Sequence, residues 1–223
     1  MKRATAFLVP MLLASLGLSA CTGVAGFGVA GSGVSATQTR DLGEFHALRI
    51  VGSSDVRVQV GEAQSVAVTA DDNLIGDLTT DVENGVLVVS TRSNTNLSFR
   101  VSPTVNISVP NLDAVFIEGS GSAQVEALKA DSFRGEILGS GNLKVSGRAA
   151  QLTLRILGSG DADLSTLECE NAEAAITGSG DARLACSQSL DVKITGSGDV
   201  TYAGSPKTTK KVITGSGSVS PAR

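Results

Sequence analysis

The chain has 223 residues, enough for one domain with a substantial buried core. It contains 26 glycines, no tryptophan, one tyrosine and six phenylalanines, which favours short strands and tight turns over helix bundles or enzymes with deep apolar pockets. The formal net charge is −4, and removing residues 1–20, which hold Lys2 and Arg3 but no acid, leaves 16 basic against 22 acidic residues, a net charge of −6. A mildly acidic surface argues against nucleic-acid binding.

A positively charged start followed by an apolar run opens the chain. Lys2 and Arg3 precede residues 4–18, which are apolar apart from a few small residues and one proline. This run is too short and too interrupted to span a bilayer permanently. The pattern therefore predicts a signal peptide over residues 1–20.

The apolar run ends in Leu-Ser-Ala-Cys at residues 18–21, which resembles the bacterial lipobox. The resemblance implies that Cys21 is acylated and holds a lipoprotein in the membrane of the cell envelope, since several acyl chains give durable anchoring. In a Gram-negative cell, Thr22 after this cysteine implies sorting to the outer membrane. The alternative is ordinary cleavage after Ala20, which would leave Cys21 as a free thiol.

Gly, Ala, Ser and Thr dominate residues 22–40, and their apolar residues show no periodicity. This composition predicts a flexible tether that, together with the lipidated cysteine, occupies residues 21–40. A flexible segment of about 19 residues has a root-mean-square span of roughly 25 Å. The tether would therefore give reach to the domain that follows, predicted over residues 41–223.

Short strands are expected over residues 41–118. Residues 50–58 alternate apolar and polar side chains on either side of a Gly-Ser-Ser turn, and further strands are expected at 66–68, 86–89 and 105–109. Because residues 50–58 share the phase of the repeats that follow them, we expect this region to form divergent, longer coils of the same domain.

A Gly-Ser-Gly triplet begins six times in residues 119–223, at intervals of 20, 19, 20, 18 and 19 residues. A fixed period near 20 residues indicates a solenoid. We expect the triplets to form a repeated coil corner, because such a corner needs positive φ or close approach of two backbones, and glycine allows both. The corner glycines are Gly119, Gly121, Gly139, Gly141, Gly158, Gly160, Gly178, Gly180, Gly196, Gly198, Gly215 and Gly217.

The residues around each triplet form columns. The fourth and sixth residues after the first glycine are apolar, while the fifth is polar, as expected for a strand with one side in solvent. Coils of about 20 residues suit a single-domain parallel β-helix better than a leucine-rich repeat, whose spaced Leu and Asn pattern is absent. The residue two before each triplet predicts an interior ladder of isoleucines: Ile117, Ile137, Ile156, Ile176, Ile194 and Ile213.

Three features of the chain resemble the GIN-domain family, the head domains of autotransporter adhesins. They are the opening at residues 45–50, the sequence Ile-Ser-Val-Pro-Asn-Leu at 107–112, and the repeated Gly-Ser-Gly-Asp-Ala-like motif. The resemblance covers about residues 41–220. It implies an all-β, right-handed parallel β-helix, generally without catalytic residues, and a role in adhesion to a protein or glycan ligand.

One acidic column raises the question of a metal site. Asp161, Asp181 and Asp199 lie three residues after the first glycine of their triplets. Stacked carboxylates repel unless they point apart, take up a proton or bind a cation, so a calcium row is one interpretation. Turn residues that accept hydrogen bonds from backbone amides are the other, which we favour because Ser122 and Ser218 occupy the same column. We therefore expect no metal and no cofactor.

The sequence offers little for catalysis. His46 is the only histidine, and no nucleophile elbow is present. Asp161, Asp163, Asp181 and Arg183 are the candidates for an enzyme that modifies acidic polysaccharides, but they sit in repeated motifs, and we expect Asp163 and Arg183 to form a surface ion pair. We predict a non-catalytic interaction module; the alternatives are a polysaccharide-binding or polysaccharide-modifying protein and a passive structural component of the envelope.

Two further features concern covalent and chain-to-chain contacts. Cys169 and Cys186 lie nine and ten residues before the next triplet, so they fall on successive coils. A disulfide between them is reasonable in an exported protein, and two small buried thiols are the alternative. The last coil ends close to residues 221–223, so we expect an uncapped edge that pairs end to end with a second copy or is closed by the tail.

Overall fold

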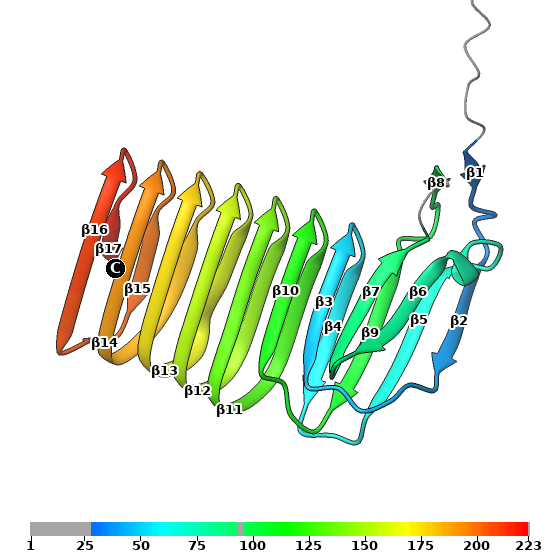
Figure 1. Cartoon of the computed structure of the whole chain (residues 1–223), viewed down its shortest axis with the longest axis horizontal. Coiled ribbons are helices and arrows are strands. Elements are labelled where there is room, and N and C mark those ends of the chain that lie inside the picture. Colours follow the sequence, from blue (N-terminus) through cyan, green and yellow to red (C-terminus); the bar gives the residue numbers. More distant parts are fainter. Residues whose placement is uncertain (1–27, 93–95, 223) are drawn as a thin grey trace, which may run out of the picture.

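Successive coils of the chain stack along one axis in the computed structural model, which describes residues 28–92 and 96–222 (Figure 1). The signal peptide over residues 1–20 and the acylation of Cys21 lie outside the described residues. The strands form a β-solenoid of about five turns, as the Gly-Ser-Gly period predicts. No helix in the described part of the chain is long and apolar enough to cross a membrane.

Each regular coil runs up one wall of the solenoid, turns at its Gly-Ser-Gly corner and returns along the other wall. The regular coils consist of β10 (Ala114–Gly119), β11 (Ser122–Gly139), β12 (Asn142–Gly158), β13 (Asp161–Gly178), β14 (Ala182–Gly196), β15 (Val200–Ala203), β16 (Thr208–Gly215) and β17 (Val219–Pro221). They are preceded by β1 (Val29–Ala30), β2 (Ser35–Arg40), β3 (Ala47–Gly52), β4 (Asp55–Val60), β5 (Ser65–Asp71), the 3-10 helix η1 (Ile75–Asp77), β6 (Leu78–Glu83), β7 (Val86–Thr91), β8 (Leu97–Ser98) and β9 (Thr104–Val109).

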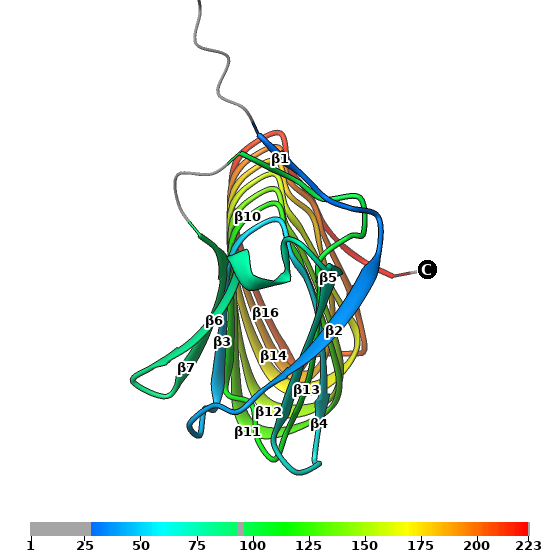
Figure 2. The ribbon, with the colours of Figure 1, turned by 90° about the vertical axis from the view of Figure 1, so that its right-hand side faces the viewer.

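The two walls give the solenoid two flat faces, seen end-on in Figure 2. We call face A the outer surface of the strands that lead into the corners: β6, β7, β3, β10, the second halves of β11 to β14, and β16. Face B is the outer surface of the strands that leave the corners: β2, β5, β9, β4, the first halves of β11 to β14, β15 and β17. The long strands β11 to β14 bend from one wall to the other, so all of these strands belong to one sheet.

The predicted isoleucine ladder is confirmed. Ile137 is paired with Ile117 on one side and Ile156 on the other, and all three are fully buried. Burying an isoleucine side chain contributes about 1.5–3 kcal/mol, so this column is a main source of stability. Ile213, in the last coil, is 41% exposed because β16 pairs with β14 on one side only within the described residues. End-to-end pairing of two copies through this edge stays a prediction that concentration-dependent sedimentation tests.

The corners also form as predicted. The first glycine of each triplet has φ between 125° and 133°. A Cβ on Gly178 would overlap the carbonyl oxygen of Gly158 in the preceding coil, and one on Gly180 would overlap that of Gly160. Ser179 N donates a hydrogen bond to the carbonyl oxygen of Gly158 at 2.9 Å, so adjacent corners are joined through their backbones.

The N-terminal coils differ from the regular ones. β6 and β7 form an antiparallel hairpin, and β5 lies antiparallel to both β9 and β2. The flexible tether expected over residues 21–40 is therefore wrong for residues 29–30, which pair with β8, and for residues 35–40, which pair with β5. The sequence gives no apolar pattern there because β2 is a largely exposed edge strand held by backbone hydrogen bonds.

A buried carboxylate organises this end of the solenoid. Asp71 is fully buried and accepts hydrogen bonds from the backbone amides of Gly33 at 2.7 Å, Arg100 at 2.9 Å and Val101 at 3.0 Å. Burial alone would raise the pKa of Asp71, but these hydrogen bonds outweigh it and lower the pKa below its ordinary value. One side chain thus joins β5 to two separate loops, and η1 covers the core beside it with buried Ile75.

Candidate interaction surfaces

The aspartate column of face B is part of the corners. Oδ1 of Asp161 accepts a hydrogen bond from Asp181 N at 2.9 Å, and Oδ1 of Asp181 accepts one from Asp199 N at 2.8 Å. Asp199 repeats the contact with Ser218 N at 2.7 Å. Each carboxylate therefore ties its coil to the next, as the turn interpretation predicts. Within residues 28–92 and 96–222, no group of three His, Cys, Asp or Glu residues could hold a metal ion.

The charged side chains of face A around Phe116 neutralise one another. Glu136 pairs with Arg134 at 2.7 Å and with Arg155 on the neighbouring coil at 4.0 Å. Arg134 and Arg49 lie over the ring of Phe116, with their guanidinium carbons 5.6 and 5.7 Å from the ring centre, within the range of a cation–π contact. Face A therefore has few free charges around its centre.

Face B carries a row of polar side chains whose basic members are not neutralised in this way. Five residues occupy one column on neighbouring coils, and we call them the face-B row: Arg57, Gln124, Lys144, Asp163 and Arg183. The three basic residues are exposed, and none of them forms an ion pair in the part of the chain that the structure describes.

Asp163 does not form the ion pair with Arg183 that the sequence suggested. Its carboxylate instead accepts hydrogen bonds from the Ser165 hydroxyl at 2.6 Å and from Ser165 N at 3.2 Å. The hydroxyl contact is the main cause that lowers the pKa of Asp163, with smaller contributions from Lys144 and Arg183. A partner two residues away on the same strand orders fewer side-chain torsions than a long arginine reaching across coils.

A groove of about 530 Å³ runs over the face-B row. Its floor includes all five members of the row together with the polar side chains of Asp55, Ser122, Asn142 and Asp161. A second groove of about 250 Å³ shares Arg57 and Gln124 with it and continues toward Asn106. The two grooves are open rather than enclosed and follow one another along the solenoid axis.

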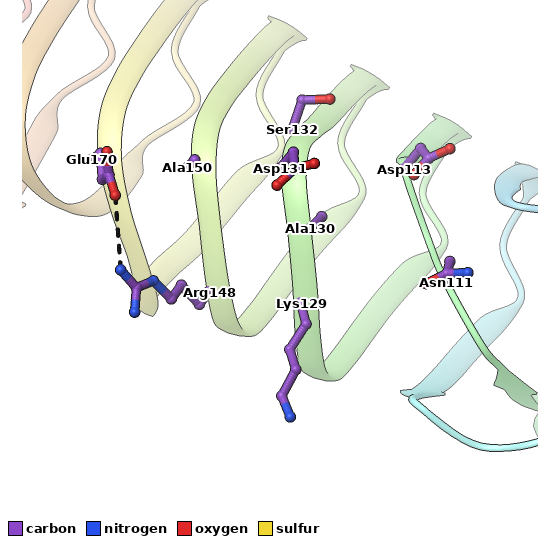
Figure 3. Close-up of a pocket in the computed structure, with 9 residues that line it drawn as sticks. All are labelled: Asn111, Asp113, Lys129, Ala130, Asp131, Ser132, Arg148, Ala150 and Glu170. Atoms are coloured by element: carbon purple, nitrogen blue, oxygen red, sulfur yellow. Dashed lines mark ion pairs between the residues drawn. The ribbon is translucent and has the colours of Figure 1, made fainter.

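A larger hollow of about 840 Å³ lies along the edge where each coil returns from face B to face A (Figure 3). Lys129 and Asp131 line it from one coil, and Arg148 and Glu170, 3.7 Å apart, line it from the next two. Asp113, at its other end, pairs with Nδ1 of His46 at 3.1 Å. Among the described residues, no serine or cysteine forms a hydrogen bond with the His46 side chain.

The two cysteines of the predicted disulfide lie on adjacent strands, opposite each other. Cys169 and Cys186 are direct neighbours on β13 and β14, and both are buried. The structure has both thiols free, with Cys169 Sγ donating a hydrogen bond to the carbonyl oxygen of Ala185 at 2.9 Å. Burial raises the pKa of the Cys169 thiol to about 12, and the neighbouring Cys186 adds to the effect. The predicted disulfide stays a prediction for thiol counting to test.

Sequence reasoning identified the columns but missed two features. The first is the contrast between the paired charges around Phe116 on face A and the unpaired cations of the face-B row. It depends on which side chains come within reach of one another, and the column pattern does not contain that information. The second is the buried Asp71. An aspartate directly after the alternating residues 66–70 signals that the strand ends there, but it does not show that the carboxylate is buried.

Comparison with known proteins gives one family. A family model described as "Putative auto-transporter adhesin, head GIN domain" matches residues 44–206. No curated protein matches the chain. A solved structure of a "putative adhesin" from Bacteroides fragilis shares 20% identity with this chain at a TM-score of 0.74, covering 87% of this chain and 100% of that one.

Two further structures are similar at lower scores. A "putative adhesin" from Parabacteroides merdae has 22% identity and a TM-score of 0.59, and a "putative lipid binding protein" from Parabacteroides distasonis has 23% identity and a TM-score of 0.55. In both cases the match covers 87% of this chain and 99% of the other. At these identities the likeness shows a shared fold.

Proposed function

The chain belongs to the GIN-domain family of auto-transporter adhesin heads, and we propose that it is a non-catalytic adhesion module displayed by a bacterial lipoprotein. The observation that carries the proposal is the solenoid itself, whose coils are locked by backbone hydrogen bonds at every corner and present two flat faces. A rigid rod of this kind can hold a binding surface in a fixed orientation away from a membrane.

The proposed anchor is Cys21, as the lipobox-like sequence indicates. Eight residues along the chain from it, Val29 begins β1 at one end of the solenoid, while β16 and β17 lie at the other end (Figure 1). Eight residues span at most about 30 Å even when fully extended. Acylation of Cys21 would therefore keep the β1 end near the membrane and direct the β16 end outward.

Protease accessibility tests the display. An epitope placed after Arg223 should be lost when intact cells are treated with protease, and Cys21→Ser should move the protein from the membrane fraction to the soluble fraction. Incorporation of labelled palmitate that disappears in Cys21→Ser would support acylation. Protection of the epitope until the envelope is broken would contradict surface display and would favour a periplasmic binding role.

The hydrogen bonds of the corner aspartates support the proposed absence of catalysis. Asp161 and Asp181, which an enzyme acting on acidic polysaccharides would need, are engaged with backbone amides of the next coil. Incubation with acidic polysaccharides should release no new reducing ends above the level of Asp161→Asn. A product that is formed by the natural chain and is lost in this variant would contradict the proposal.

A further inference from the structure

We infer that the face-B row is a binding strip for a linear polysaccharide in which acidic and neutral sugars alternate, lying along the solenoid axis. The inference rests on the proposed adhesion function and deepens it by naming a surface and a ligand class. It starts from the order of the row along the axis: cation, amide, cation, carboxylate, cation.

The spacing of the row is set by the sheet. Neighbouring coils are about 4.8 Å apart, so Arg57, Lys144 and Arg183 follow one another at intervals of about 10 Å, and the row is about 19 Å long. One sugar ring of an extended chain advances by nearly the same distance as one coil. A chain with an acidic group on every second ring would therefore bring one acid to each cation.

The residues between the cations fit the neutral rings. Gln124 lies between Arg57 and Lys144. Its amide nitrogen donates one hydrogen bond to Glu126 at 2.7 Å, and it keeps a second N–H donor and an acceptor oxygen, whereas the Asp163 carboxylate between Lys144 and Arg183 only accepts hydrogen bonds. Sugar hydroxyl groups can meet both requirements. An acidic group opposite Asp163 would be repelled, so the row favours a polymer with one charge for every two rings over a polymer with a charge on each ring.

The basic groups are available to a ligand. The cations of face A around Phe116 are held by Glu136 and Glu118, whereas those of the face-B row form no ion pair in the described ranges. The groove above the row is open rather than enclosed, and its floor also holds the carboxylates of Asp55 and Asp161, of which Asp161 accepts a hydrogen bond from Asp181 N. Its lining contains no aromatic side chain, so sugar stacking does not contribute, and contacts with exposed charges should make the binding strongly salt-dependent.

Binding of the purified full-length chain to three polymers tests the ligand class. Hyaluronan has one carboxylate for every two rings, polygalacturonate has one on every ring, and dextran has none. We expect hyaluronan to bind most tightly, polygalacturonate more weakly and dextran not measurably. Raising the ionic strength from about 0.1 M to about 1 M shortens the Debye length from about 10 Å to about 3 Å and should abolish the hyaluronan signal.

Charge-neutralising variants test the surface. Arg57→Gln, Lys144→Gln and Arg183→Gln should each weaken hyaluronan binding about two- to fivefold, as expected for exposed charge contacts, and the triple variant should weaken it more than about tenfold. Lys193→Gln is the matched control, because Lys193 is an exposed lysine on face A that forms no ion pair within the described residues. This control should bind like the natural chain.

Asp163→Asn tests the alternation. It removes the negative charge but keeps an oxygen for the Ser165 contact, so it should strengthen binding to polygalacturonate more than binding to hyaluronan. Equal binding of all anionic polymers, or an equal loss in Lys193→Gln, would overturn the inference in favour of non-specific charge attraction. No binding of hyaluronan would overturn it as well, and protease digestion of the epitope on intact cells would show that the proposed display still stands.

Discussion

A single methyl group at a corner should destabilise the whole solenoid. In Gly178→Ala the new Cβ overlaps the carbonyl oxygen of Gly158, and the backbone has φ of 131°, which side chains rarely adopt. The strain costs about 1–2 kcal/mol, and displacing the corner weakens the hydrogen bond from Ser179 N to the same oxygen, worth about 1 kcal/mol. With some further cost for moving the adjacent coil, we expect a loss of about 2–4 kcal/mol in the free energy of unfolding.

Urea unfolding followed by far-UV circular dichroism measures this loss. With a slope of about 1–3 kcal/mol per molar urea, the midpoint should fall by about 1–2 M. The control is Ser179→Ala, which changes an exposed side chain of the same corner and should alter the free energy by less than about 0.5 kcal/mol. Equal midpoints for the two variants would refute the argument that close backbone approach requires glycine at this position.

Three further predictions concern the buried core, Asp71 and the two cysteines. Ile176→Ala, in the buried ladder, should cost about 2–5 kcal/mol in urea unfolding, whereas Thr177→Ala on the exposed side should change little. Because the pKa of Asp71 is lowered below 3.8 in the folded state, its carboxylate stabilises the fold above that pH, and the contribution disappears as the pH falls through the folded-state pKa. The natural chain should therefore have a higher midpoint temperature of thermal unfolding than Asp71→Asn near neutral pH, and the difference between the two midpoints should shrink in acid. With a Cys169 pKa of about 12, a thiol reagent at neutral pH should label Cys169 slowly in the folded chain. Labelling of both Cys169 and Cys186 in denaturant without reductant would contradict the predicted disulfide. Absence of labelling in denaturant would show that the two cysteines are bridged.

The regular coils could be predicted from the sequence because each depends on a repeated local requirement. A corner with positive φ and close backbone contact needs glycine in every copy, and a buried column such as that of Ile156 needs an apolar side chain in every copy. Stacking in register then follows, since any shift of one residue would turn the isoleucines toward solvent. The repeat also allowed the corner aspartates to be interpreted as turn residues. Ser218 occupies the same column, and replacing an aspartate by a serine costs little in a turn.

The N-terminal coils, from β1 to β9, could not be predicted in this way. Each of their contacts occurs only once, so no period reveals them. The strand Ser35–Arg40 has the composition of a tether and is held mainly by its backbone pairing with Ser65–Asp71. The buried Asp71 binds amides that lie 38, 29 and 30 residues away in the chain, and no local pattern links these positions.

The charge pairing on the two faces could be predicted only in part. Column positions show that Asp163 lies beside Arg183, and proximity in a ladder suggested an ion pair. A short side chain, however, reaches a hydroxyl two residues along its own strand more easily than it reaches a guanidinium on another coil, and the Ser165 contact forms instead. The consequence is that Arg183 keeps its charge available at the surface. A ladder on a solenoid therefore predicts which side chains are level with one another, whereas their competing local partners decide which charges remain free for a ligand.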